Sequence, residues 1–310
     1  MKVVIDFDGT LTAEEQQARP LAEKSLDTLA NEIIGAPRQE LAEAYDATQA
    51  RLLAAPHRFW WEVNGLIASY CDEGAFILNT TTLQVMLRDN DAYSQAVTEA
   101  FPEAEYDPGV DCTNYLFHRH TAELPPVFRP AAREVLTALA KDPDREPVIL
   151  TNSLGDKVER HLATLALEDK VAVLGDTRQY EMNLGWAHRF SCGESGGIQV
   201  WPVDKLHRVD LRRPVYYQAL AQALEEDSDI AVVADTLSLP GALPLMMGIS
   251  FFLLRTSYTP DWCVRAVEAH RLGRVLDSLS ELPGALVKVA GQQPGQIGWN
   301  EWKGKNCPDG

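Results

Sequence analysis

Short apolar runs recur along the chain, and several end in a polar residue. The first, residues 3–5, is three consecutive β-branched residues, and similar runs cover 147–150, 171–174, 229–234 and 249–254. Such runs are typical of strands buried on both faces of a parallel sheet. Apolar residues at helical spacing follow at 130–141, 157–167, 214–224, 261–270 and 274–282. This alternation predicts an α/β fold with a doubly wound parallel sheet.

A long stretch after the first strand shows only helical patterns. Apolar residues recur there at intervals of three and four, and prolines interrupt the pattern. We therefore expect an all-helical insertion at 13–126, and Pro125 and Pro126 mark the return to a core formed by 1–12 and 127–290. Residues 291–310 are rich in Gly, Pro and polar residues, and they are expected to form a loosely ordered tail.

Polar residues at the ends of the predicted strands are the first candidates for chemistry. Asp6 and Asp8 follow the first strand, Thr151 follows the run at 147–150, and Asp235 follows the run at 229–234. In open α/β sheets, ligands bind beyond the carboxyl ends of the strands. Each residue also has a structural interpretation, as a turn aspartate or as part of a helix N-cap near Ser153.

Composition and charge narrow the classes of partner. With 28 basic and 45 acidic residues, the net charge is 28 − 45 = −17, which disfavours nucleic acid as a partner. A site for a phosphorylated substrate must therefore supply its own positive charge. There is no apolar run long enough for a membrane span and no basic leader, so we expect no membrane partner.

The cysteines indicate the redox environment. They are five in number and contain no CxxC pair, which suggests reduced thiols in a cytoplasmic protein: Cys71, Cys112, Cys192, Cys263 and Cys307.

The string DFDGTLT at 6–12 resembles the first motif of the haloacid dehalogenase-like superfamily of aspartate-nucleophile hydrolases. The resemblance implies a Rossmann-like core with a cap domain inserted after this motif. It also implies that Asp6 is the nucleophile and Asp8 the general acid and base. The sequence TNS resembles the second motif, so that Thr151 holds a phosphoryl oxygen and Asn152 lies beside it in the loop.

Two further motifs of the family have partial counterparts. Arg213, directly before a helix-opening proline, matches the basic third-motif residue, and Arg212 is its rival; a plain exposed basic pair is the alternative. The resemblance implies that Mg²⁺ is held by Asp6, Asp235 and the main-chain carbonyl of Asp8. The further acid that the family usually carries after its fourth-motif aspartate is replaced here.

The replaced positions are Leu239 and Pro240, and an acid from elsewhere, such as Asp176, is the alternative for completing the site. Two segments of the insertion are candidates for substrate contact. PHRFWWE at 56–62 contains His57 and Arg58, with helix packing of its tryptophans as the alternative. FHRH at 117–120 is alternatively a solvated interdomain segment, and its HxH spacing has no partner ligands nearby.

These features together predict a Mg²⁺-dependent phosphatase, a phosphoric monoester hydrolase that acts on a small phosphorylated metabolite through an aspartyl-phosphate. Asp8 argues against the dehalogenase branch of the superfamily. The alternatives are a phosphomutase or other phosphotransferase, including a phosphonate-cleaving relative for which only Lys24 offers a cap lysine. A non-catalytic binding protein with an eroded fourth motif is the rival from a different class.

Overall fold

The structure is a computed structural model, and it describes residues 1–167, 169–191 and 197–288. The chain divides into two compact units, one formed by Met1–Ala13 together with the chain from Phe128 onward, the other by Glu14–Val127. The first contains every expected strand end, and we call it the core unit; the second is the inserted unit. The expected tail at 291–310 lies outside the described residues.

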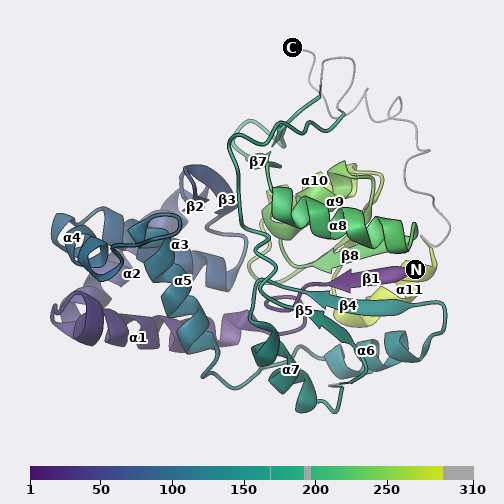
Figure 1. The fold of residues 1–310 in the computed structure, drawn as a ribbon, viewed down its shortest axis with the longest axis horizontal. Coiled ribbons are helices and arrows are strands. Elements are labelled where there is room, and N and C mark those ends of the chain that lie inside the picture. Colours follow the sequence, from purple (N-terminus) through teal and green to yellow (C-terminus); the bar gives the residue numbers. More distant parts are fainter. Residues whose placement is uncertain (168, 192–196, 289–310) are drawn as a thin grey trace. The chain divides into compact units, whose positions relative to one another are not determined.

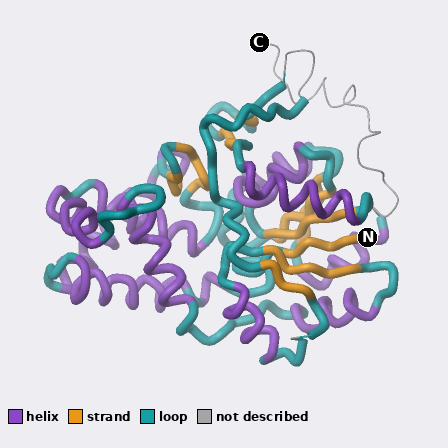
Figure 2. Tube along the Cα trace, in the orientation of Figure 1, coloured by secondary structure: helices purple, strands orange, loops and turns teal. Residues whose placement is uncertain are grey.

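The core unit is built on a parallel sheet of six strands in the order β10-β9-β8-β1-β4-β5 (Figures 1 and 2). Every pairing between neighbouring strands is parallel, which confirms the α/β fold class. The strands are β1 (Lys2–Ile5), β4 (Glu146–Leu150), β5 (Ala172–Leu174), β8 (Ile230–Ala234), β9 (Ser250–Leu254) and β10 (Gly273–Leu276).

Helices cover both faces of this sheet (Figure 1). They are α6 (Ala132–Lys141), α7 (Gly155–Ala163), α8 (Pro214–Glu226), α9 (Ala242–Met246), α10 (Asp261–Ala269) and α11 (Leu282–Val287). Val3 and Ile5 of β1 belong to one buried cluster with apolar residues of α6, α7 and α11. Figure 1 shows α8, α9 and α10 on the opposite face, as the doubly wound pattern predicts.

The expected helix at 274–282 is wrong. Residues Gly273–Leu276 form β10, which pairs in parallel with β9 through Val275 and Leu276 opposite Leu253 and Leu254. The available partner strand decides the outcome, because a short apolar run has no strong helical preference of its own. The helix begins only at Leu282.

The inserted unit is mainly helical but contains a β-hairpin. Its helices are α1 (Ala18–Thr28), α2 (Arg38–Ala54), α3 (Ala75–Arg88), α4 (Asp91–Ala100) and α5 (Pro108–Thr121), and its strands are β2 (Trp60–Val63) and β3 (Leu66–Tyr70). The expectation of an all-helical insertion is therefore wrong at this point. Asn64 and Gly65 both have positive φ, 53° and 72°, which is the signature of a tight two-residue hairpin turn.

The same hairpin changes the interpretation of the tryptophan pair. Trp60 and Trp61 lie in β2, so they do not pack as residues of a helix. Trp61 points into the inserted unit and is 8% exposed, whereas Trp60 is half-buried. The alternation of buried and half-buried positions along WWEV is the period of a strand.

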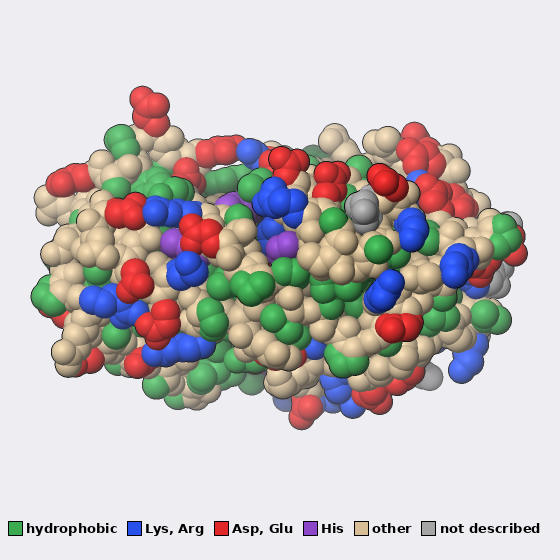
Figure 3. Space-filling view, turned by 90° about the horizontal axis from the view of Figure 1, so that it is seen from below, with side chains coloured by type: hydrophobic (Ala, Val, Ile, Leu, Met, Phe, Trp, Pro, Cys, Tyr) green, Lys and Arg blue, Asp and Glu red, His purple; other side chains and the backbone are tan. Residues whose placement is uncertain are grey.

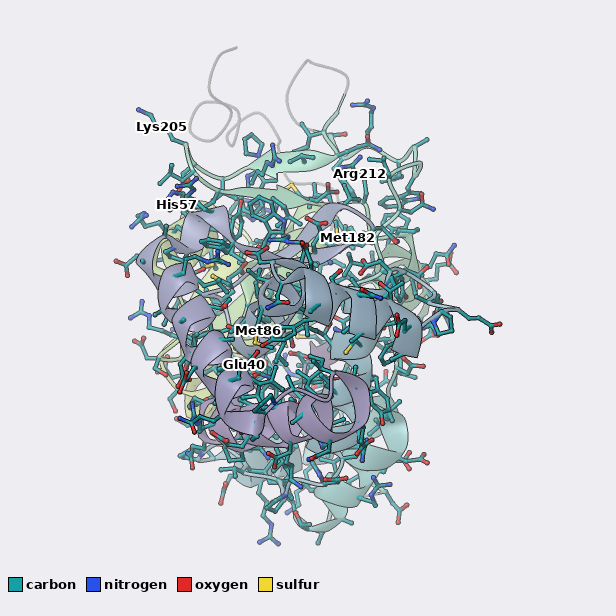
Figure 4. All side chains as sticks on the ribbon, turned by 90° about the vertical axis from the view of Figure 1, so that its left-hand side faces the viewer. Glu40, His57, Met86, Met182, Lys205 and Arg212 are labelled. Atoms are coloured by element: carbon teal, nitrogen blue, oxygen red, sulfur yellow. The ribbon has the colours of Figure 1, made fainter. Side chains whose placement is uncertain are left out.

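A second hairpin belongs to the core unit. Its strands β6 (Val200–Pro202) and β7 (Arg208–Asp210) are antiparallel. Lys205 lies at the tip of this hairpin (Figure 4). His207 stacks on Trp262 of α10 with ring centroids 4.4 Å apart, which attaches the hairpin to a helix of the sheet.

The charged surface, the cysteines and the helix lengths can be compared with what the composition led us to expect. Acidic and basic side chains are interspersed over the face drawn in Figure 3, so the excess negative charge is not gathered there. Among the described cysteines, the thiols of Cys71, Cys112 and Cys263 are buried. None of the described helices is both long and apolar enough to cross a membrane.

Candidate active site

Three neighbouring strands of the sheet deliver polar residues to one edge. β1 pairs with β8 on one side and β4 on the other, so Ile5 lies opposite both Val233 and Ile149. Asp6, Thr151 and Asp235 each follow one of these strands directly. The Asp6 backbone N–H still donates to Val233 O at 2.9 Å, which keeps the first aspartate in line with the sheet.

The turn after β1 brings Asp235 against the first motif. Gly9 has a φ of 78°, and a Cβ there would lie only 2.7 Å from Asp235 Oδ1. Only glycine permits this backbone conformation and this close approach. Thr10 Oγ1 donates to the same Oδ1 at 3.3 Å, and Arg129 Nε donates to Gly9 O at 2.7 Å.

Asp235 carries a strongly perturbed carboxyl. The side chain is 3% exposed, and burial raises its pKa well above the ordinary value; the negative charge of Asp6 raises it further. Arg129 and the Thr10 hydroxyl act in the opposite direction. A buried carboxylate and a half-buried one that repel each other at a strand edge form a natural place for a cation.

The donor set fits Mg²⁺, provided that the ion keeps several waters. Within the described ranges, no group of three or more His, Cys, Asp and Glu side chains is arranged to hold a metal ion, so Asp176 does not complete a larger cluster. Leu239 and Pro240, where the sequence resemblance leads one to expect an acid, are buried in the segment Leu237–Gly241. Mg²⁺ is commonly bound through one or two carboxylates together with substrate phosphate, and Asp6 and Asp235 can provide the two carboxylates.

Asp8 turns toward α7 and is held by two residues that sequence analysis did not assign. Ser153 Oγ donates to Asp8 Oδ2, and Lys157 Nζ lies 3.2 Å from Oδ1. The ammonium also donates to Ser153 Oγ at 2.8 Å. Ser153 and Lys157 are both almost fully buried, at 1% and 4% exposure. A buried cation therefore faces the second aspartate.

The i, i+4 rule for helix faces does not find this pair, because Ser153 lies before α7, which begins at Gly155, whereas Lys157 lies in its first turn. Sequence analysis considered the residues near Ser153 as a helix N-cap. The N-cap of α7 is instead Leu154, without a side-chain cap, and this frees the serine hydroxyl for Asp8.

His161 continues the same helix face one turn further. Its ring is 8% exposed, and Nδ1 has no hydrogen-bond partner among the described residues. Burial lowers the pKa of His161 to about 4, with the charge of Lys157 adding to the effect and Asp8 opposing it. The imidazole is therefore neutral near pH 7.

The loop after β4 is fastened by the segment that begins at residue 175, whose role the sequence did not reveal. Asn152 Oδ1 accepts the Gln179 N–H at 2.7 Å, and Thr177 Oγ1 donates to Thr151 O at 2.8 Å. Gln179 Nε2 donates to Leu150 O at 3.0 Å. Asn152, expected to bind substrate, thus uses its amide oxygen to hold this segment, while Thr151 stays at the strand end, 1% exposed.

The two adjacent arginines have different environments. Arg213 is 1% exposed, and its Nη1 donates to Gln179 O at 3.2 Å. Arg212 instead forms a two-point ion pair with Asp210, with Nε 2.9 Å from Oδ1 (Figure 4). Arg213 therefore enters the core unit directly before α8, whereas Arg212 is held by the hairpin strand β7.

The candidates of the inserted unit lie in two different settings. His57 and Arg58 belong to the short helix Pro56–Arg58 before β2, where His57 is half-buried and Arg58 exposed (Figure 4). Their role in substrate binding stays a prediction. The FHRH segment is the last turn of α5: His120 is buried and its Nε2 lies 2.9 Å from Thr28 Oγ1. The interpretation as a solvated segment is therefore wrong for His120, whereas Phe117, His118 and Arg119 are partly exposed.

Comparisons with solved structures return similar folds at low sequence identity. The chain is similar to a haloacid dehalogenase-like family hydrolase from Xanthomonas campestris, at 15% identity with a TM-score of 0.43, covering 94% of this chain and 92% of that one. A putative hydrolase of the same superfamily from Bacillus subtilis, bound to magnesium, matches at 14% identity with a TM-score of 0.47 and coverages of 92% and 97%.

A predicted phosphoglycolate phosphatase from Haemophilus somnus matches at 15% identity with a TM-score of 0.43, covering 91% of this chain and 96% of that one. No protein-family model matches the chain, and no curated protein matches it significantly.

Proposed function

We propose that the protein is a Mg²⁺-dependent phosphatase that hydrolyses a small phosphorylated metabolite, with Asp6 as nucleophile. One observation carries the proposal: the two aspartates of the first motif have separate environments. Asp6 stays at the strand end near the buried Asp235, whereas both oxygens of Asp8 are engaged by Ser153 and Lys157. Separate environments allow two carboxylates to take different chemical roles.

In the proposed reaction, an Asp6 oxygen attacks phosphorus in line with the leaving group. The Asp6 O–P bond forms, the bond from phosphorus to the leaving oxygen breaks, and Asp8 gives that oxygen its proton. Water then attacks the phosphorus of the aspartyl-phosphate, Asp8 takes the proton from the water, the Asp6 O–P bond breaks, and inorganic phosphate leaves.

The positive charge for the phosphoryl oxygens comes from residues of this chain and from the metal. Lys157 and Arg213 are both almost fully buried, and a buried cation acts on nearby charge through a low dielectric. Thr151 is the expected hydroxyl donor to a phosphoryl oxygen. When bound at Asp6 and Asp235, Mg²⁺ would neutralise charge on the phosphate. These groups supply the local positive charge that a chain of net charge −17 requires.

Hydrolysis of p-nitrophenyl phosphate tests this function. We expect phosphate release that requires Mg²⁺, is abolished by EDTA and returns when Mg²⁺ is added. Asp6→Asn should lose activity by several orders of magnitude while it keeps the thermal stability of the parent, since the two side chains have nearly equal size. Absence of turnover on aryl phosphates and on a panel of phosphorylated metabolites would favour the non-catalytic binding protein instead.

A further inference from the structure

The turn after the first motif is held by an arginine that lies far from it in the sequence. Arg129 Nε donates to the carbonyl oxygen of Gly9 at 2.7 Å, across 120 positions of the chain. Gly9 is buried and directly follows Asp8. A buried carbonyl needs a hydrogen-bond partner, and a charged donor gives a stronger bond than a neutral one. Sequence analysis gave Arg129 no role.

Main-chain contacts join the two segments without the help of this side chain. The Arg129 N–H donates to Leu11 O at 2.9 Å, and Thr12 and Phe128 form an isolated antiparallel bridge. These contacts hold residues 11–12, shortly before the chain leaves the core unit, against the residues by which it returns. The guanidinium extends the contact toward the two aspartates, as far as Gly9. Fastening of the returning chain does not require that extension, so the side-chain bond calls for a separate explanation.

The guanidinium holds the peptide between Gly9 and Thr10. A glycine with a φ of 78° sets few steric limits on its flanking peptides, so this turn needs other contacts to keep one conformation. Arg129 binds the carbonyl of this peptide, and the Thr10 hydroxyl donates to Asp235 Oδ1 at 3.3 Å. The two bonds together fix the turn that connects Asp8 with the neighbourhood of Asp235.

We propose that Arg129 is a positioning residue for this turn: through its bond to Gly9 O it fixes the main chain at Asp8 in the conformation that proton transfer requires. This inference rests on the proposed function, because it assumes that Asp8 transfers the proton. Arg129 acts through Gly9, and the proposal gives it no contact with the substrate. The competing explanation is that Arg129 stabilises the returning chain and has no effect on the reaction.

Arg129→Met and Arg129→Lys separate the two explanations. Both replacements keep a long unbranched side chain at this half-buried position, but only lysine can donate to Gly9 O. If Arg129 positions the turn, Arg129→Met should lower kcat about 10- to 100-fold, the range for a lost hydrogen bond from a charged group. Arg129→Lys should stay within about fivefold of the parent, because the donor is kept. KM should change by less than about threefold in both variants.

Hydrogen exchange measured by mass spectrometry gives a readout that does not depend on activity. The amides of Leu11 and Thr12 both donate to Phe7 O, at 2.9 and 3.1 Å, and close the turn that Arg129 holds. Arg129→Met should therefore speed exchange in the peptide that covers residues 7–12. Exchange in the buried strand β8 should stay as in the parent, because the change opens the turn locally.

Arg145→Met is the matched control. Arg145 is also a half-buried arginine, but it precedes β4, at the opposite edge of the sheet from Asp6, and its Nε lies 3.7 Å from Asp142 Oδ2. Its replacement removes the same functional group without affecting Gly9. We expect kcat within about twofold of the parent and unchanged exchange at residues 7–12.

Three results would overturn the inference in favour of a purely structural arginine. They are an unchanged kcat in Arg129→Met, equally lowered kcat values in Arg129→Met and Arg129→Lys, and exchange that becomes faster over the whole core unit. If Asp6→Asn keeps full activity, the proposed function fails, and this inference fails with it. If Asp6→Asn is inactive while Arg129→Met is unaffected, only this inference fails.

Discussion

Replacing Lys157 by Met tests the interaction that the structure adds to the first motif. Methionine keeps the length and volume of the side chain but removes the charge, leaving Asp8 without its cation. Lys157 Nζ lies 3.2 Å from Asp8 Oδ1 and donates to Ser153 Oγ at 2.8 Å. Removal of one partner of a buried ion pair costs about 3–5 kcal/mol. Because the Asp8 side chain is 17% exposed, we expect the lower end, about 3 kcal/mol.

A double-mutant cycle with Asp8→Asn isolates the pair. A neutral amide at position 8 needs no cation, so the loss caused by Lys157→Met should be smaller in the Asp8→Asn background, with a coupling of about 2 kcal/mol. Urea unfolding monitored by tryptophan fluorescence gives the four free energies. The control is Lys170→Met, since Lys170 is exposed and its Nζ donates to a backbone carbonyl, Ala166 O, at 2.9 Å. Additive effects at Lys157 and Asp8 would refute the interaction.

Contacts of Arg213, His161 and Gly9 give three more predictions. Arg213→Ala should lower kcat/KM far more than Arg212→Ala, because Arg213 is buried in the core unit, at 1% exposure, whereas Arg212 is held by β7. Steady-state kinetics of the two variants tests this, and the reverse order of the two losses would move the role to Arg212. His161 has a folded-state pKa of about 4 against 6.5 for the ordinary side chain, so protonation favours the unfolded state and stability should fall by up to about 3 kcal/mol as the pH decreases from about 6.5 to 4. His161→Gln should flatten that part of the stability curve, and parallel curves for both proteins would contradict the assignment. Gly9→Ala, whose Cβ would lie 2.7 Å from Asp235 Oδ1, should reduce both the melting temperature and the activity, and wild-type values for both would show that the turn tolerates a side chain.

The strands that form the site could be predicted because burial leaves a clear pattern. Strands β1 and β8 are buried along their whole length, and their β-branched and aliphatic runs stand out against the surrounding helices. Parallel strands also share one carboxyl edge, so residues that follow them converge at the same place. Asp6, Thr151 and Asp235 were located by this reasoning.

Residues that depend on tertiary contacts escaped prediction. Lys157 occupies an ordinary helical position and Arg129 lies in a connecting segment, and nothing in the local sequence indicates that one faces Asp8 or that the other donates to Gly9 O. The hairpin β2–β3 was missed for a different reason: the turn signal Asn64-Gly65 was present, but the surrounding helical pattern outweighed it. The periodicity of apolar residues indicates which side chains share one face of a helix or strand. The tertiary contacts of the folded chain decide what that face packs against.

Trapping of the phosphoenzyme tests the central claim most directly. The protein is mixed with an aryl phosphate and Mg²⁺, quenched in acid within milliseconds and treated with borohydride, which reduces an aspartyl-phosphate to homoserine. Peptide mass spectrometry then locates the modified residue. We predict homoserine at position 6 in the parent protein, and none in Asp6→Asn. Phosphatase turnover without modification of Asp6, or with modification of Asp8 instead, would contradict the assignment of the nucleophile.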